Sequence, residues 1–303
     1  MTIKDFLVLN ILGALWGASF LFMRLASPVL GPFLLIDLRV LLAGVALLLS
    51  VLAARQIPDY RHTWRQYFLL GALNAAVPFT LIASSELHLS ASVSSILNAT
   101  TPLFTALVAR VWLKETLSTK KIISLLLGIG GVVVLAGWGQ LGTSPVIWLS
   151  ILFSLLAAVS YGFGGVYAKR AFASEPFLTV TIGQQLAAGM LLLPFSLPSA
   201  GRLMRLSIGM SCAVLALALI CTAIAYILYF YLNRQVGPTK TSSVTLLVSV
   251  YGVIWGMLFL HEMASFGELF GMIIILSSVS LITEVKFRPL KAKADEHPLE
   301  KRQ

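Results

Sequence analysis

Ten long apolar runs constrain the fold of this chain more than any other feature of its sequence. They lie near residues 6–25, 33–54, 67–86, 90–112, 121–138, 146–168, 177–198, 208–232, 239–260 and 266–284. Each run is long enough to cross the hydrocarbon core of a bilayer, about 30 Å thick, as a helix. We therefore predict an all-α integral membrane protein with ten transmembrane helices, for which the lipid bilayer is the first partner.

The composition excludes a soluble globular domain. Apolar residues make up 58% of the chain and charged residues only 11%, whereas a soluble domain carries roughly 25% charged residues. The net charge of +10 would point to nucleic acid in a soluble protein. Here the basic residues gather in loops on one side of the predicted bundle, so we expect no nucleic-acid partner.

The distribution of Lys and Arg predicts the orientation in the membrane. With the N-terminus in the cytoplasm, all but five of the 22 basic residues fall in cytoplasmic segments. Arg24, Arg202 and Arg205 would lie outside, and Arg39 and Arg110 lie within runs. This pattern predicts a multi-pass protein of the inner (plasma) membrane with both termini cytoplasmic. The first run exceeds the length of a signal-peptide core, so we interpret it as a retained helix.

The second half of the chain repeats the first. Leu113-Lys114-Glu115 recurs 147 positions later as Leu260-His261-Glu262. At an offset of 145, Trp16 falls on Tyr161 and Arg39 on Gln184; at 147, Phe79 falls on Tyr226.

Because each half holds five helices, an odd number, the second copy enters the membrane from the opposite face. We predict two inverted repeats, 1–140 and 141–285, followed by a polar cytoplasmic tail, 286–303. Inverted repeats are typical of secondary transporters.

Several motifs resemble a known family. They are the stretch 14–20, Arg39, the block 91–115 with Pro102, Gly128-x-Gly130-Gly131, and a second copy at 238–262 followed by Gly271. With these motifs the chain resembles the ten-helix branch of the EamA-type drug/metabolite transporter (DMT) superfamily over residues 6–284.

The resemblance implies a carrier without enzymatic activity, and its closest functional branch comprises exporters of amino acids and related metabolites, including the YddG type. The chain departs from the pattern where Pro102 is matched by Ser249, and Pro78 by Ala225. We therefore expect the helix kinks to differ between the halves.

A secondary transporter needs a substrate site near the bilayer midplane, and polar residues inside spans tend to face the bundle interior. We expect a small-molecule substrate, first an amino acid or related compound with export as its direction, moved by alternating access. Other metabolites or drugs are the alternative. For each candidate residue the competing interpretation is helix–helix packing. The candidate substrate-binding residues are Trp16, Ser19, Arg39, Asn74, Asn98, Tyr161, Gln184, Tyr226, Thr245 and Ser249.

Arg39 is the sharpest of these candidates, because its guanidinium could hold a substrate carboxylate through two parallel hydrogen bonds. The alternatives are that it extends towards the membrane surface, or pairs with Asp37 or a backbone carbonyl. Glu115 and Glu262 follow helices at opposite membrane faces. We interpret them as ties between a helix end and a neighbouring segment in preference to gates.

The sequence offers little for other classes of function. The His and Cys residues show no metal-ligand spacing, and there is no nucleotide-binding loop, so we expect no metal, cofactor or ATP drive. All twelve acidic residues lie at span ends or in loops, which disfavours carboxylate-based proton antiport and an intramembrane enzyme. The glycine-rich runs suit either tight internal packing or a dimer face, which leaves monomer and homodimer open.

Overall fold

The computed structural model describes residues 2–53, 63–116, 118–138, 144–237 and 241–282. Within these ranges every regular element is a helix and none is a strand. Eight helical spans are long and apolar enough to cross a membrane, and two shorter apolar helices, Val244–Leu260 and Phe266–Leu281, complete the set. The prediction of an all-α membrane protein with ten helices is confirmed. The predicted tail, 286–303, and Pro238, where the second copy of the family motif begins, lie outside the described residues.

The helices follow the predicted runs, with three of the runs divided into shorter segments. In chain order they are α1 (Ile3–Leu30), α2 (Pro32–Ala53), α3 (Trp64–Gly71), η1 (Ala72–Ala76), α4 (Val77–Ser85), α5 (Ala91–Asn98), α6 (Thr101–Trp112), α7 (Thr119–Trp138), α8 (Pro145–Ala171), α9 (Phe177–Ser196), η2 (Leu197–Arg205), α10 (Ile208–Leu215), η3 (Ala216–Ile224), α11 (Ala225–Val236), α13 (Val244–Leu260) and α14 (Phe266–Ile282).

The interruptions of the helices agree between the third and eighth spans, which correspond in the repeat, and differ between the fourth and ninth. The third span contains the π-helical turn η1 and the eighth contains η3, at positions related by an offset of 147. Pro78 follows η1 and Ala225 follows η3, so both spans contain a π-helical turn although only the third has a proline beside it. The fourth span does break before Pro102, between α5 and α6, whereas α13 runs unbroken through Ser249.

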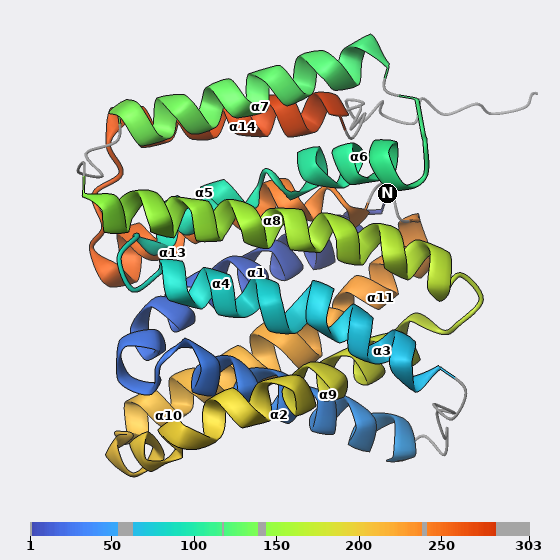
Figure 1. The fold of residues 1–303 in the computed structure, drawn as a ribbon, viewed down its shortest axis with the longest axis vertical. Coiled ribbons are helices and arrows are strands. Elements are labelled where there is room, and N and C mark those ends of the chain that lie inside the picture. The colour runs from blue at the N-terminus through green and yellow to red at the C-terminus, as the bar shows by residue number, and fades with distance from the viewer. Residues whose placement is uncertain (1, 54–62, 117, 139–143, 238–240, 283–303) are drawn as a thin grey trace, which may run out of the picture.

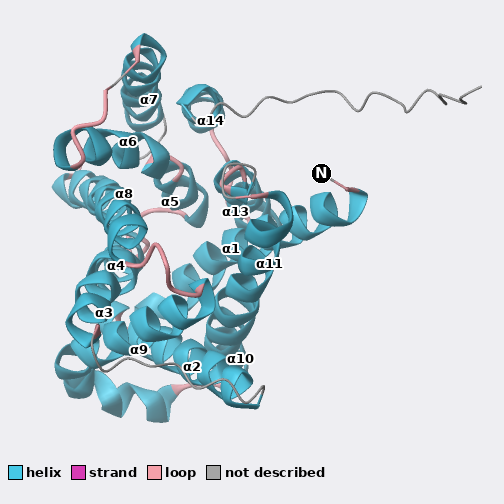
Figure 2. Ribbon diagram, turned by 90° about the vertical axis from the view of Figure 1, so that its right-hand side faces the viewer, coloured by secondary structure: helices cyan, strands magenta, loops and turns pink. Residues whose placement is uncertain are grey.

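The packing of the spans comes in matched sets. Helix α1 packs against α13 and α11, and α8 packs against α5, α6 and α4, which are the corresponding spans of the other half. Helices α2 and α9 lie side by side, and α7 pairs with α14 at the edge of the bundle, as Figure 1 and Figure 2 show. This is the arrangement that two inverted copies would produce, and the repeat with its boundaries stays a prediction.

The two Leu-x-Glu motifs adopt the same turn. Lys114 and His261 both have left-handed backbone conformations, with φ of 56° and 54°, and they are the only non-glycine residues in the described chain that do. The N–H of Glu115 then donates to the carbonyl of Ala109, and that of Glu262 to the carbonyl of Gly256. In both motifs this hydrogen bond to the carbonyl six residues earlier ends the helix, α6 in one case and α13 in the other.

Glycines bring the edge pair together. A Cβ on Gly131 would lie 2.7 Å from Ile275 Cγ1, and one on Gly271 would lie 2.7 Å from Leu135 Cβ, whereas one on Gly130 would meet nothing within 4 Å. Gly128 likewise faces Leu103 and Ser278. Most of this glycine run therefore serves internal packing between α7 and α14.

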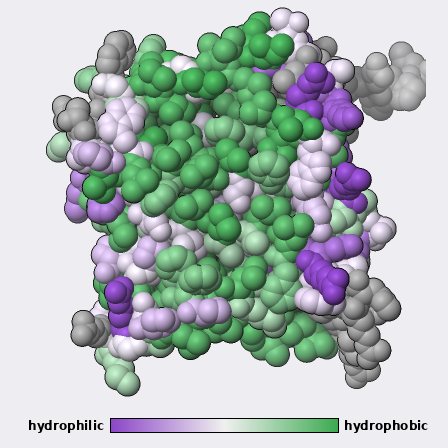
Figure 3. Space-filling model, in the orientation of Figure 1, coloured by the Kyte–Doolittle hydropathy of each residue, from purple (hydrophilic) through white to green (hydrophobic). Residues whose placement is uncertain are grey.

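The surface suits a bilayer. Figure 3 shows apolar side chains over the middle of one face and polar ones gathered towards its two edges, where helices begin and end. Large apolar side chains are exposed along α7 and α14, among them Leu126, Val133, Phe270 and Ile273. Apolar surface of this extent is stable only against lipid or another apolar surface.

Candidate functional site

Arg39 lies two turns into α2, and only 4% of its surface is exposed. Its Nε donates to Thr222 Oγ1 on η3 at 3.0 Å, and an Nη atom approaches Met23 Sδ on α1 at 3.3 Å. The guanidinium also stacks 3.8 Å from the ring centroid of Phe79 on α4. These partners are a hydroxyl, a thioether and an aromatic face, and all three are neutral.

Neither structural alternative for Arg39 fits these contacts. The side chain is buried, so it does not extend to the membrane surface. Asp37 faces elsewhere and accepts a hydrogen bond from the Ser196 hydroxyl of α9. Within the described residues no carboxylate lies at ion-pair distance from Arg39. A buried cation without an anion is unfavourable by several kcal/mol unless a ligand completes it.

Aromatic rings surround the guanidinium. Phe79 contacts Tyr161 of α8 edge to face, with 6.1 Å between the ring centroids. Trp16 of α1 contacts Tyr226 of α11 in the same way at 6.0 Å, and its ring centroid lies 5.3 Å from that of Tyr229. Tyr161 and Tyr226 both lie close to Arg39. These rings provide flat apolar walls with phenolic groups at their edges.

Two side-chain amides complete the cluster. Asn74 Nδ2 on η1 donates to Gln184 Oε1 on α9 at 3.0 Å, and Gln184 Nε2 reaches the Tyr226 hydroxyl at 3.5 Å. Gly164 of α8 makes room for Asn74, since a Cβ there would lie 3.0 Å from Asn74 Cβ. Amides can both donate and accept, which suits an ammonium group or an amide on a ligand.

The two halves of the sequence meet in this cluster, because repeat-related positions lie together in it. Those positions are Trp16 with Tyr161, Arg39 with Gln184, Phe79 with Tyr226, and Asn74 with Cys221, which lies close to Arg39. Each half thus brings an aromatic residue from its first and third spans and a long polar side chain from its second. We call these eight residues, with Thr222, the central cluster.

The remaining sequence candidates lie in other surroundings. Ser249 is fully buried between α13 and α5, where its hydroxyl donates to the Ser95 carbonyl at 2.8 Å. Thr245 donates to the carbonyl of Ser242 within its own turn. Asn98 ends α5, and its Oδ1 is buried and accepts no hydrogen bond from the described residues. Ser19 is buried on the same helix as Trp16, near Cys221.

Sequence reasoning missed three contributors. Thr222 and Met23 bind the Arg39 guanidinium and Phe79 stacks on it, and all three stand in apolar runs. Only Phe79 carried a signal, since it falls on the candidate Tyr226 in the repeat.

A second polar cluster ties α5 to α13 at one end of the bundle. The Glu262 carboxylate accepts hydrogen bonds from the amides of Ala91 at 2.8 Å and Ser92 at 3.0 Å, and from the Ser92 hydroxyl at 2.5 Å. Ser95 and Ser249 then exchange hydroxyl-to-carbonyl contacts one turn further along. The expectation that Glu262 ties a helix end holds here, and the segment that it ties is a helix N-terminus.

Glu115, the counterpart of Glu262 in the repeat, makes no such cap. Its carboxylate lies 4.0 Å from Lys169 Nζ, with the two side chains 43% and 78% exposed. Helix α6 packs against α8 instead of continuing along α13. The fourth and ninth spans are therefore fastened together where α5 begins, which we call the α5–α13 end.

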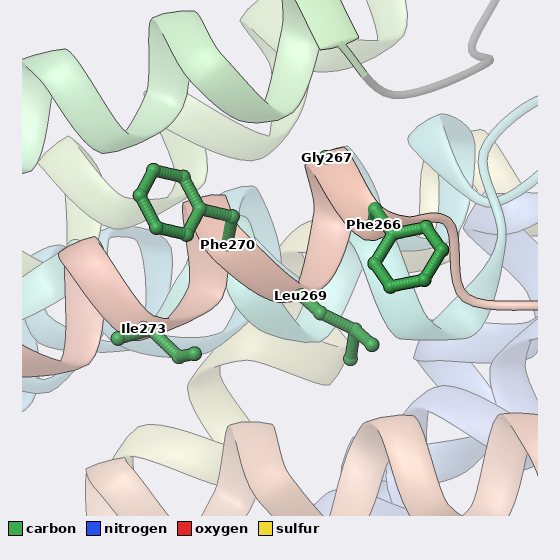
Figure 4. Close-up of a pocket in the computed structure, with 5 residues that line it drawn as sticks. All are labelled: Phe266, Gly267, Leu269, Phe270 and Ile273. Atoms are coloured by element: carbon green, nitrogen blue, oxygen red, sulfur yellow. The ribbon is translucent and has the colours of Figure 1, made fainter.

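A surface hollow at the start of α14 offers no polar chemistry. Figure 4 shows its lining, which is formed by Phe266, Gly267, Leu269, Phe270 and Ile273. These side chains carry no hydrogen-bonding group, and the hollow lies on the exposed edge pair. It suits an acyl chain, and the central cluster remains the candidate site.

Comparison with known proteins decides the family. A family model described as the EamA-like transporter family matches residues 5–137 and again 148–284. The chain belongs to the EamA-like transporter family. Its relatives include the uncharacterized transporter YvbV of Bacillus subtilis, 25% identical over 95% of this chain and 94% of that protein.

Other EamA-like relatives carry similar names. The uncharacterized inner membrane transporter YedA of Escherichia coli K12 is 29% identical over 90% of this chain and 88% of its own length. A solved structure titled "Crystal structure of protein" aligns with a TM-score of 0.62 at 20% identity, covering 93% of this chain and 96% of that one, which supports the fold. This EamA-like chain is therefore a multi-pass membrane transporter and not an enzyme.

Proposed function

We propose that this EamA-like transporter moves a small metabolite that carries a carboxylate, first an amino acid or a related compound, by alternating access. The observation that carries the proposal is the buried guanidinium of Arg39, whose partners in the described residues are all neutral. A substrate carboxylate would supply the missing anion in a low-dielectric site, where charge-assisted hydrogen bonds are strongest.

The rest of the central cluster supports an amino acid over a simple carboxylic acid. The Asn74–Gln184 pair and the Tyr226 hydroxyl offer oxygen acceptors to an ammonium group. Trp16, Phe79 and Tyr161 give a side chain apolar walls. A cationic drug would meet the positive charge of Arg39, which disfavours that alternative.

Alternating access has support in the packing of the fourth and ninth spans. They are fastened at the α5–α13 end and part towards α6. Basic side chains lie at the other end of the bundle, on Lys4, Lys114, Lys169 and Arg234. If that end is cytoplasmic, as the charge pattern predicts, the fastened end faces outward and the transporter is closed to the outside.

With this orientation, we propose that both termini are cytoplasmic, that the transporter lies in the inner membrane, and that it exports its substrate. Support comes from the resemblance to amino-acid exporters and from an inner membrane relative, YedA.

The test is counterflow in proteoliposomes loaded with a mixture of unlabelled amino acids, with labelled ones outside. Arg39→Gln is compared with Arg110→Gln, a control at an exposed arginine near the end of α6. We expect counterflow that Arg110→Gln retains and Arg39→Gln weakens roughly 30-fold or more, since a charged hydrogen bond is worth about 2–3 kcal/mol. No counterflow by well-folded wild-type protein would overturn the amino-acid proposal.

A further inference from the structure

Glu86 is a fully buried carboxyl group that the proposed transport site does not use. It follows Ser85, the last residue of the third span, and its exposed fraction is 0%. Both carboxyl oxygens are inaccessible and accept no hydrogen bond from the described residues. The guanidinium of Arg24 binds the backbone carbonyl of Glu86 and not its carboxylate.

Few charged residues of the described chain lie near Glu86. Helices α8, α2 and α1 pack against α4. Arg24 comes from α1 and Arg39 from α2, while α8 carries no charged residue before Lys169 near its other end. From beyond α13, Glu262 adds a negative charge. On its own segment the nearest titratable group is His88, which is exposed.

Burial raises the pKa of Glu86 well above its ordinary value, the Glu262 charge raises it further, and Arg24 and Arg39 oppose the rise. Desolvation is the largest of these effects, because an ionised carboxylate without hydrogen bonds is costly in a low-dielectric interior. The neutral acid is the form that this environment favours.

The position of Glu86 links it to the fastened end of the bundle. It lies at the same end as Glu262, whose carboxylate holds the N-terminus of α5, and α5 follows Glu86 after a short turn. Opening this end would require Glu262 to leave the amides of Ala91 and Ser92. Water would then reach the segment between α4 and α5.

We infer that Glu86 is a proton-binding site that controls the α5–α13 end: the neutral acid keeps this end closed, and loss of the proton opens it. On opening, the carboxyl O–H transfers its proton to water and the carboxylate becomes hydrated. The inference rests on the alternating-access part of the proposed function. It does not depend on which substrate the transporter carries.

The direction of the pH effect follows from proton linkage. The open end, being hydrated, returns Glu86 towards the ordinary carboxylic range, whereas the closed end keeps its pKa raised. The contribution of Glu86 to closure is therefore fully present when the pH is below the ordinary carboxylic pKa. It is lost as the pH rises through the raised pKa that Glu86 has in the closed state. Between the two values the ratio of open to closed molecules rises by up to about tenfold per pH unit.

Distance measurement by electron paramagnetic resonance tests this directly. Spin labels are placed at His88→Cys and Met263→Cys, two exposed positions at the α5–α13 end, in full-length protein in lipid. Cys212 is exposed and is replaced by serine, while Cys221 is buried and stays. From pH 4 to pH 9 we expect a short-distance population to give way to a longer one.

Three variants assign the response. Glu86→Gln, a neutral mimic, is expected to keep the short distance at every pH, and Glu86→Asp, which still titrates, to keep the transition. Glu268→Gln removes another largely buried carboxyl at this end, which is hydrogen-bonded to Ser265, and is expected to respond as wild type does. A wild-type distance that ignores pH, or a Glu86→Gln variant that still responds, would overturn the inference. Counterflow tests the transport proposal separately.

Discussion

Removal of the Glu262 carboxylate should destabilise the protein far more than removal of its repeat counterpart. Glu262 accepts three hydrogen bonds from the first turn of α5, at 2.8, 3.0 and 2.5 Å. Glu115 ends an equivalent turn but makes only a 4.0 Å approach to an exposed lysine. In the Glu262→Ala and Glu115→Ala variants, the same side chain is removed after the same left-handed residue conformation. The two sites differ in the groups that the carboxylate contacts.

The magnitude follows from helix capping. Loss of an N-cap acceptor costs about 1–2 kcal/mol, and the negative charge at a helix N-terminus contributes up to about 1 kcal/mol more. We expect Glu262→Ala to lower the free energy of unfolding by about 2–3 kcal/mol. An exposed ion pair contributes under about 1 kcal/mol, so Glu115→Ala should change it little.

Thiol reactivity provides the assay. Cys221 is 1% exposed, so a thiol-reactive dye reports unfolding once the exposed Cys212 has been replaced by serine. At roughly 2–4 °C per kcal/mol, Glu262→Ala should lower Tm by about 4–12 °C relative to Glu115→Ala. Equal Tm values for the two variants would show that the Glu262 cap contributes nothing and would refute the reasoning.

Two further substitutions test packing. Gly131→Val places its new Cβ 2.7 Å from Ile275, so thermal unfolding should show a loss of stability of about 1–3 kcal/mol. The Cβ of Gly130→Val meets nothing within 4 Å, so this variant should stay within about 0.5 kcal/mol of wild type. Equal losses of stability in the two variants would contradict the α7–α14 contact. Ser249→Ala removes one hydrogen bond between α13 and α5 and should cost about 1 kcal/mol in stability while counterflow affinity stays unchanged; a loss of affinity would return Ser249 to the list of ligands.

Much of the fold could be predicted from the sequence, because apolar runs of span length have only one stable state in a bilayer. The local irregularities could not. The π-helical turn η3 has no proline beside it, and Pro78 next to η1 gave no reason to expect a matching turn in the eighth span. Such turns depend on how neighbouring helices pack, which a single run of residues does not encode.

The central cluster was partly predictable, and for a physical reason. Two inverted copies place equivalent positions around a common axis, so Trp16 with Tyr161 and Arg39 with Gln184 could be expected near one another. Thr222 was not distinguishable from other small residues in apolar runs until the structure placed it against Arg39. Ser249 shows the converse, since a polar residue inside a span also serves helix packing.

Glu86 marks the limit of counting charges by position. Its sequence position is the end of a span, like that of several other acidic residues, yet its side chain is completely buried. Burial at a span end depends on the turn between α4 and α5 and on the helices packed over it, and both are tertiary features.

The most direct test of the central claim pairs a change in the substrate with a change at Arg39. Counterflow affinity is measured for a transported amino acid and for its carboxamide, which lacks the negative charge, with wild type and with Arg39→Gln. The wild type should prefer the carboxylate by roughly 30-fold or more, and Arg39→Gln should abolish most of that preference, a coupling of about 2–3 kcal/mol. A preference that Arg39→Gln retains in full would contradict the assignment of Arg39 as the carboxylate ligand.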